Sequence, residues 1–295
     1  MRNWLILSFL LFSIIILAAI KANAQITITK SNMPIAGQNY IYTTSNDSVD
    51  VYITGANKTW DYSKIVPVSQ DTFKYITAQK ASILYALSFN GDAALDLKLA
   101  NLKGAYSFFK TTNTQYSQAG MGITIPGLGL PTPLVYQKPD IIYNLPLNYS
   151  NTDSCTFLDT TTISLGITVK IRIAGKRVNT VDGWGTVKTP HNTYNCIRIK
   201  SVVSEIDSFA GIPIDRSRIE YKWWSTTENI PVMEAIVTKN AIGGGSTFSL
   251  HYKDSYKVII NPNGPQIAFN VADTNVFINE FQIYLVTWRI SGLNW

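Results

Sequence analysis

Alternating apolar and polar positions dominate the second half of the chain. From residue 167 onward, Val169, Ile171 and Ile173 share one face of an extended segment, while Lys170 and Arg172 share the other. A side-chain period of two is that of a β-strand with one buried face. This stretch is therefore predicted to be a half-buried strand.

Five more strands are predicted after this first one, each bounded by turn residues. They cover residues 185–189, 194–207, 215–225, 232–238 and 247–253. Asp182-Gly183 is a hairpin signal, and Gly175 indicates a bulge or bend. Because the links have hairpin length, an antiparallel meander is expected. The predicted fold class is all-β: an antiparallel β-sandwich or curled meander sheet, with an N-terminal signal helix.

The first half gives a weaker pattern. Residues 25–42 predict an opening strand with a turn at Pro34 and Gly37. Residues 119–133 hold four glycines and three prolines among apolar residues, which predicts a loop laid over the sheet and covering an edge. The simplest partition is one β domain over residues 25–255 and a short tail over residues 256–295.

Residues 1–24 have the pattern of a secretory signal peptide. A short basic start precedes an almost wholly apolar run over residues 4–20, and Ala22-Asn23-Ala24 fits a cleavage site before Gln25. The alternative is a permanent membrane anchor, but a helix over residues 4–20 would span about 25 Å. The hydrocarbon core is about 30 Å thick. We expect export, cleavage and no permanent membrane span afterwards.

Composition narrows the class further. Apolar residues make up 46% of the chain and charged residues only 15%, which argues against a disordered chain or a coiled coil. The formal net charge of +6 is too mild to indicate nucleic-acid binding. No nucleic-acid partner is expected for an exported protein.

Five stretches resemble a secreted β-rich module of cargo proteins that Bacteroidota export by type IX secretion. They occur in the expected order: residues 33–37 (MPIAG), 55–63 (GANKTWDYS), 145–149 (LPLNY), 182–194 (DGWGTVKTPHNTY) and 221–232 (YKWWSTTENIPV). Ser150 stands where the module has a glycine. The resemblance implies export and a β-rich architecture, and no chemistry is assigned to the module.

The tail resembles the small β-sandwich sorting domain of the same cargo proteins. Residues 261–264 (NPNG) and 281–290 (FQIYLVTWRI) look like its start and middle, but Ile260, Leu285 and Trp288 depart from its pattern. Two interpretations stay open: a degenerate or truncated sorting signal, or a tail that packs on the main domain. The expected partners are the Sec machinery and the type IX machinery. The expected location is secreted or at the cell surface, or the periplasm if the tail does not sort.

The two cysteines of the chain are predicted to form a disulfide. Cys155 and Cys196 are the only cysteines, and an exported protein meets an oxidising compartment. The alternative is two unpaired thiols. The chain carries too few histidines and cysteines for a zinc site, so neither a metal nor another cofactor is expected.

Catalytic residues are not predicted. His191 and His251 are isolated, and no nucleophile motif accompanies them. Carboxylate pairs such as Asp92/Asp96 or Glu205/Asp207 could serve a glycosidase only if the fold placed them about 5–10 Å apart across a cleft.

Strand alternation suggests a ligand face instead. Basic side chains occupy the polar positions of three strands, and Trp223 and Trp224 must point to opposite faces. If Trp223 is a core residue, Trp224 lies with the charges. The candidate face consists of Lys170, Arg172, Arg198, Lys200, Arg218, Lys222 and Trp224. Such a face would suit an anionic surface glycan.

The predicted function is that of an exported, non-catalytic surface or extracellular protein with a binding or structural role. A secreted hydrolase on the same β scaffold is the first alternative. An outer-membrane β-barrel is the second, suggested by the tyrosine content and the terminal Trp295.

Overall fold

A computed structural model describes residues 26–89, 93–98, 104–125, 129–165, 167–239, 245–257 and 259. The chain divides into two compact units, Met1–Ile259 and Ile260–Trp295. The predicted signal peptide and the sorting-domain-like stretches of the tail lie outside the described residues. The fold below is that of the first unit.

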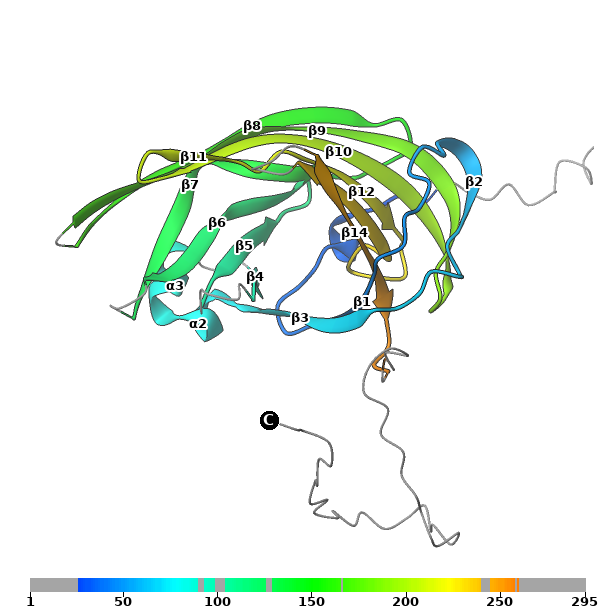
Figure 1. Ribbon diagram of the computed structural model, residues 1–295, viewed down its shortest axis with the longest axis horizontal. Helices are drawn as coiled ribbons and strands as arrows, with labels where there is room; N and C mark the ends of the chain where they lie inside the picture. Colours follow the sequence, from blue (N-terminus) through cyan, green and yellow to red (C-terminus); the bar gives the residue numbers. More distant parts are fainter. Residues whose placement is uncertain are drawn as a thin grey trace, which may run out of the picture. The chain divides into compact units, whose positions relative to one another are not determined.

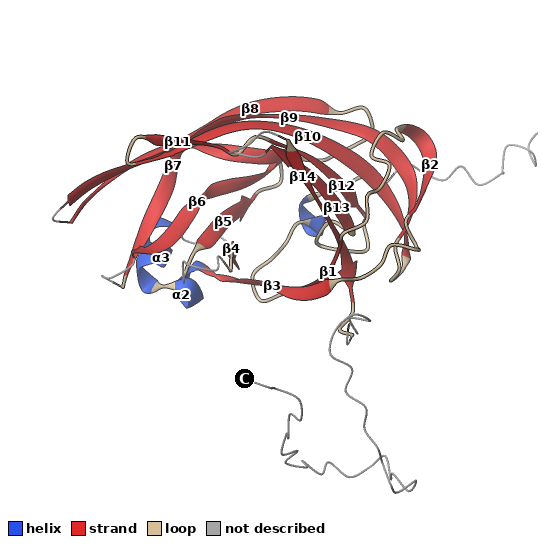
Figure 2. Ribbon diagram, viewed as in Figure 1, coloured by secondary structure: helices blue, strands red, loops and turns tan. Residues whose placement is uncertain are grey.

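The described chain consists mainly of β-strands, as predicted (Figure 1; Figure 2). The strands are β1 (Asn39–Ser45), β2 (Gly55–Asp61), β3 (Ser69–Thr77), β4 (Ala93–Asp96), β5 (Tyr106–Thr111), β6 (Gln115–Ile125), β7 (Leu130–Asn144), β8 (Thr152–Leu165), β9 (Ile167–Lys188), β10 (Thr193–Phe209), β11 (Ile212–Asp215), β12 (Arg218–Trp224), β13 (Met233–Lys239) and β14 (Ser246–Asp254). Three short helices accompany them: η1 (Lys30–Asn32), α2 (Ala78–Ala81) and α3 (Ile83–Ser88).

Twelve of these strands close into an antiparallel β-barrel. Neighbours in the ring follow chain order, from β1 to β3 and on through β10 and β12 to β14. The last strand then pairs with the first, where Ile41 lies opposite Asp254. Strands β2 and β11 attach outside the ring, to β9 and β10. The predicted β-sandwich or curled meander sheet is therefore wrong, because hairpin-linked neighbours continue around until the two edges of the sheet meet.

One predicted turn is absent from the described strands. Asp182-Gly183 does not reverse the chain, because β9 runs through it as one strand of 22 residues. The signal marks a register shift instead, which lies opposite Arg198 in the pairing of β9 with β10. Gly183 and Gly185 are needed there for close packing of β2. A Cβ on Gly185 would lie 1.9 Å from the carbonyl oxygen of Lys58.

The predicted loop over residues 119–133 is instead part of the hairpin of β6 and β7. Gly120 and Gly122 leave room for aromatic rings. A Cβ on Gly120 would lie 2.8 Å from the Phe89 ring, and one on Gly122 would lie 2.6 Å from the Tyr85 ring. Glycine in these strands therefore serves close packing, not a turn.

The joint between β7 and β8 is made largely by side chains. Its ladder has one residue pair, Lys138 with Leu158. Next to this pair, the side-chain amide of Gln137 on β7 makes the hydrogen bonds to the β8 backbone that a neighbouring strand would otherwise make. Its Oε1 accepts from the Thr160 backbone N–H at 2.7 Å, and its Nε2 donates to the Thr160 carbonyl at 3.3 Å.

Each face of the barrel wall packs a separate core. Trp224 on β12 contacts Tyr143 on β7, four strands away around the ring, so this face lines the lumen. The neighbouring Trp223 points outward and packs against Trp60 with ring centroids 6.1 Å apart. Residues 46–68, which we call the outer strap, cover this outer core. Trp223 and Trp224 thus face opposite sides, as the alternation predicted.

The short helices α2 and α3 cover another part of the outer wall, over β4 and β5 (Figure 2). Tyr85 and Phe89 from this region pack on Phe108 of β5, the latter pair stacked at 4.0 Å. In the part of the chain that the structure describes, none of the helices has the length and apolar character needed to cross a membrane.

Candidate ligand-binding site

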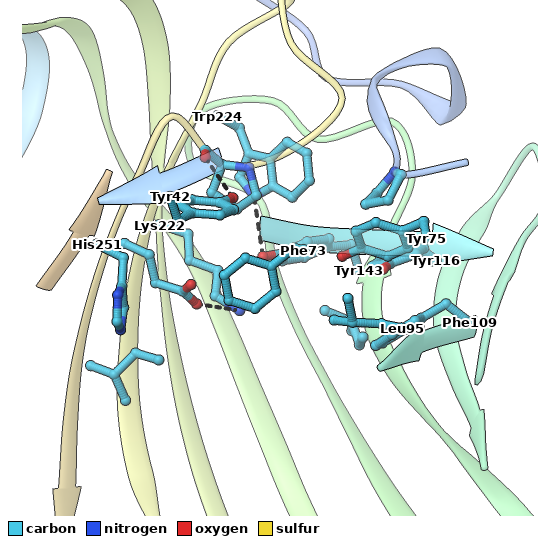
Figure 3. Close-up of a pocket in the computed structure, with 15 residues that line it drawn as sticks. Tyr42, Phe73, Tyr75, Leu95, Phe109, Tyr116, Tyr143, Lys222, Trp224 and His251 are labelled. Atoms are coloured by element: carbon cyan, nitrogen blue, oxygen red, sulfur yellow. Dashed lines mark hydrogen bonds and ion pairs between the residues drawn. The ribbon is translucent and has the colours of Figure 1, made fainter. Parts of the chain in front are cut away.

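A cavity of about 330 Å³ lies in the lumen of the barrel (Figure 3). Side chains from both halves of the chain line it: Pro34, Tyr42, Phe73, Tyr75, Leu95, Phe109, Tyr116, Ile142, Tyr143, Lys222, Trp224, Pro231, Glu234, Ile236 and His251. Seven of these carry a phenyl, phenol or indole ring. A concave, mostly apolar site with a few polar groups is the usual form of a small-molecule site.

The rings form a nearly continuous wall. Phe109 stacks on Tyr116 with centroids 5.5 Å apart, and Tyr116 stacks on Tyr143 at 6.2 Å. Tyr143 then meets Trp224 edge to face at 5.8 Å, and the indole Nε1–H donates to the Tyr143 hydroxyl at 3.2 Å. These contacts fix the rings against one another, so the wall is preformed.

Strand alternation places these side chains. On β12, Glu220, Lys222 and Trp224 face the lumen, whereas Tyr221 and Trp223 face the outer core. The same period of two places Tyr40 and Tyr42 on one face of β1, and Phe73 and Tyr75 on one face of β3, and these faces point to the lumen.

The polar edge of the cavity is a closed set of ion pairs. Lys222 Nζ lies 2.9 Å from Glu220 Oε2 and 2.9 Å from Glu234 Oε1. Burial alone would raise the pKa of Glu220, but Lys222 and other nearby cations hold it well below its ordinary value. His251 also lines the cavity, and its Nδ1 lies 3.1 Å from Thr44 Oγ1.

The ion pairs continue across the lumen. Arg177 makes a forked contact with Asp140, at 2.9 Å from Nε and 2.8 Å from Nη2, and reaches Glu220 at 3.3 Å. Arg218 bonds both Glu220 and Glu205, each at 2.6 Å. We call these residues, with Lys222 and Glu234, the luminal ion network.

A second cavity of about 270 Å³ lies beside this network. Asp140, Glu205, Asp207 and Arg218 line it together with Tyr136 and other residues. Burial, followed by the nearby charge of Glu205, raises the pKa of Asp207 to about 6.

The phenols of the first cavity are held in their neutral form. Burial is the largest cause that raises the pKa values of Tyr42, Tyr75, Tyr116 and Tyr143. These hydroxyls therefore remain protonated across the physiological range. They provide hydrogen-bond donors in a largely apolar cavity.

The predicted disulfide is wrong: both cysteines are free. Cys155 lies on the luminal face, where its Sγ lies 3.3 Å from the Ile141 carbonyl oxygen. Cys196 lies in the outer core. The barrel wall separates the two thiols, so export into an oxidising compartment cannot join them without refolding. Burial raises the pKa of Cys155 to about 11.

The residues of the predicted ligand face do not gather on one surface. Lys170, Arg172 and Lys200 point outward from β9 and β10. Arg198 also points outward, but it is buried under the outer strap and bonds Asp182 at 2.7 Å. The remaining three, Arg218, Lys222 and Trp224, line the lumen. Closure of the barrel puts the two groups on opposite sides of the wall.

Neither histidine joins a catalytic arrangement. His191 Nδ1 lies 3.3 Å from Asp254 Oδ1. Glu205 and Asp207 are two residues apart on β10 and share the second cavity, so they do not oppose one another across a cleft. Asp92 lies outside the described residues. Among the residues with described positions, no group of three or more His, Cys, Asp or Glu could hold a metal ion.

The aromatic residues contributed by the first half of the chain were not predicted. A signal for them exists: Tyr40 and Tyr42, like Phe73 and Tyr75, are spaced two apart and so share a strand face.

Comparison of the chain with family models, with curated proteins and with solved structures gave no match.

Proposed function

We propose that this protein binds a small, uncharged and largely apolar molecule in the aromatic cavity of the barrel. One observation carries the proposal: a cavity of about 330 Å³ has seven aromatic side chains in its lining, while the charged groups at its edge are paired with one another. Apolar surface that lines a cavity is stabilised when an apolar ligand replaces water.

The pairing of the charges argues for an uncharged ligand. Lys222 has a carboxylate on each side, Glu220 and Glu234. A charged ligand would lose its hydration in the cavity and would find no free countercharge there. An uncharged ligand avoids this cost.

The protonated phenols add a preference for a hydrogen-bond acceptor. Tyr143 accepts a hydrogen bond from Trp224 at 3.2 Å, so its own O–H can be donated elsewhere. A flat molecule with a carbonyl, ether or phenolic oxygen would match both the rings and this donor. The role is therefore one of binding, and we propose that it is exercised outside the cytosol, as the apolar segment near the N-terminus predicts.

A titration with the apolar probe N-phenyl-1-naphthylamine tests the proposal. Leu95→Trp and Ile236→Trp add bulk to the cavity lining, whereas Val66→Trp adds the same group at an exposed position of the outer strap. We expect at least about tenfold weaker binding for the two cavity variants and unchanged binding for the control. Equal binding by all three folded variants, checked by thermal unfolding, would contradict the proposal.

A membrane-spanning barrel is the second candidate, because a closed antiparallel ring of twelve strands is compatible with an outer-membrane barrel. Such a barrel needs an apolar band around its outer wall. The exposed outward positions of β9 include Lys170 and Arg172, and the outer strap covers several other strands. We therefore prefer luminal binding. Extraction of cell membranes with alkaline carbonate separates the two: a spanning barrel stays in the membrane pellet, and the proposed binding protein is released.

A further inference from the structure

Exposed apolar side chains gather where β10 turns into β11. Ile206 is 44% exposed, Phe209 is 53% exposed and Ile212 is 67% exposed. The turn between them has Ala210 and Gly211 in the left-handed region, at φ 51° and 86°. We call Ile206, Phe209 and Ile212 the apolar tip. It lies at the end of the unit where β8 and β9 extend outward (Figure 1).

The apolar tip is apolar on both faces of the sheet. Ile206 pairs with Ala174 of β9, on the outward side, whereas Phe209 pairs with Ile171, on the inward side. Successive strand residues alternate between the two faces of the sheet. If this turn only covered the lumen, apolar residues would be needed on the inward face alone. Apolar groups on both sides suit insertion of the tip edge-on into an apolar layer.

Two unpaired cations flank the apolar tip. Arg172 lies opposite Ser208, and the Lys170 carbonyl accepts a 3.0 Å hydrogen bond from the Ala210 backbone N–H. Both side chains are exposed, and neither forms an ion pair with a described residue. The nearby acids are neutralised: Asp207 pairs with Arg216 at 3.3 Å, and Asp215 pairs with Lys239 at 3.3 Å.

We propose that this end of the barrel docks on a membrane surface that contains anionic lipids. The apolar tip enters the boundary between headgroups and acyl chains, while Lys170 and Arg172 meet lipid phosphates. The combination favours a lipid surface over a soluble polyanion, because a polyanion offers nothing to Phe209 and Ile212. The like charges beside the tip disfavour a second copy of the chain. This inference is independent of the luminal ligand.

Vesicle flotation with the full chain tests the proposal. The probes are vesicles of phosphatidylcholine alone and of equal parts phosphatidylcholine and phosphatidylglycerol. We expect binding to the mixed vesicles only, and weaker binding as salt is added. Phe209→Ser with Ile212→Ser, and separately Lys170→Ala with Arg172→Ala, should each reduce the binding at least about tenfold.

Val66→Ser is the control, because Val66 is 60% exposed on the outer strap, whose strand β2 lies at the opposite end of the unit from β11 (Figure 1). It should bind as the wild type does, and thermal unfolding should show that all variants fold. The proposal is overturned if the mixed vesicles are not bound, or if the tip variant binds them as well as the control does.

Discussion

Trp224 and Tyr143 meet across the barrel lumen, four strands apart in the ring. The indole Nε1–H of Trp224 donates to the Tyr143 hydroxyl at 3.2 Å, and the two rings stand at 89° to each other. Both side chains are almost fully buried. This contact joins β12 to β7 in the wall of the aromatic cavity, and so it connects the stability of the barrel with the shape of the site.

The hydrogen bond between Trp224 and Tyr143 should contribute measurably to stability. Tyr143→Phe leaves the indole N–H buried without its acceptor, so we expect the free energy of unfolding to fall by about 1–3 kcal/mol. Urea unfolding measures the change. Adding Trp224→Phe to this variant should cost less than in the wild type, because the unpaired donor is then removed. Full additivity in this double-mutant cycle would argue against the contact.

Arg177 holds two buried carboxylates, Asp140 and Glu220. Arg177→Met removes the cation and leaves both acids without it, so we expect a loss of about 3–5 kcal/mol in unfolding free energy. Lys188→Met is the matched control, since the Lys188–Asp61 pair is largely exposed. Its loss should stay below about 1 kcal/mol. Similar small losses in both variants would mean that the luminal ion network is solvated.

Asp207 should make the barrel less stable as pH rises. Its pKa in the folded state is about 6, against an ordinary value of 3.8. The stability it contributes is therefore complete below about pH 3.8 and is lost as pH rises through 6. Asp207→Asn cannot ionise. The wild type should lose stability between pH 4 and 7, whereas the variant does not lose this contribution. The unfolding free energy of Asp207→Asn minus that of the wild type should therefore increase by roughly 1–3 kcal/mol over this range.

Asp61→Asn is the control for this pH series, because the pKa of Asp61 is lowered whereas that of Asp207 is raised. Hydrogen bonds from the Ser63 hydroxyl and from Lys188 lower the pKa of Asp61 to about 2, so its titration is almost complete before pH 4 is reached. The difference between this variant and the wild type should change little from pH 4 to 7. A flat profile for Asp207→Asn as well would contradict the buried environment of Asp207.

Gly185 should resist substitution more strongly than other glycines with positive φ. Its φ is 151°, and a Cβ would lie 1.9 Å from the Lys58 carbonyl oxygen, so Gly185→Ala must displace β2 from β9. We expect a loss of at least about 3 kcal/mol. Gly211→Ala, at φ 86° with open space around it, carries the backbone strain alone and should lose about 1 kcal/mol. Thermal or urea unfolding compares the two, and equal losses would count against the docking of β2.

Local strand patterns predicted much of the fold, and long-range closure could not be predicted from them. The alternation at Val169 to Ile173 correctly gave the faces of β9, and the predicted strand over residues 232–238 corresponds closely to β13. Closure depends on pairing β1 with β14, more than 200 residues apart, and no local pattern encodes this contact. The loop predicted around Gly120 and Gly122 was wrong, because a sequence does not distinguish a strand glycine packed beneath an aromatic ring from a glycine in a loop.

The sequence predicts only some of the residues that line the aromatic cavity. Lys222 and Trp224 were predicted to share a face, and both line the aromatic cavity. Arg172 and Arg198 lie on the other side of the barrel wall, although an alternating pattern alone predicts that all polar positions of a strand face solvent. In a closed barrel the lumen holds buried charges, so polar alternation did not tell inside from outside. Tyr116 and Tyr143 join the cavity through tertiary contacts that the sequence does not reveal.

The most direct test of luminal binding is a crystal structure of the full chain grown with N-phenyl-1-naphthylamine. We expect electron density for the probe between Tyr42 and Phe109, enclosed by the rings that line the lumen. Density on the outer wall, with the lumen occupied only by repacked side chains or water, would contradict it.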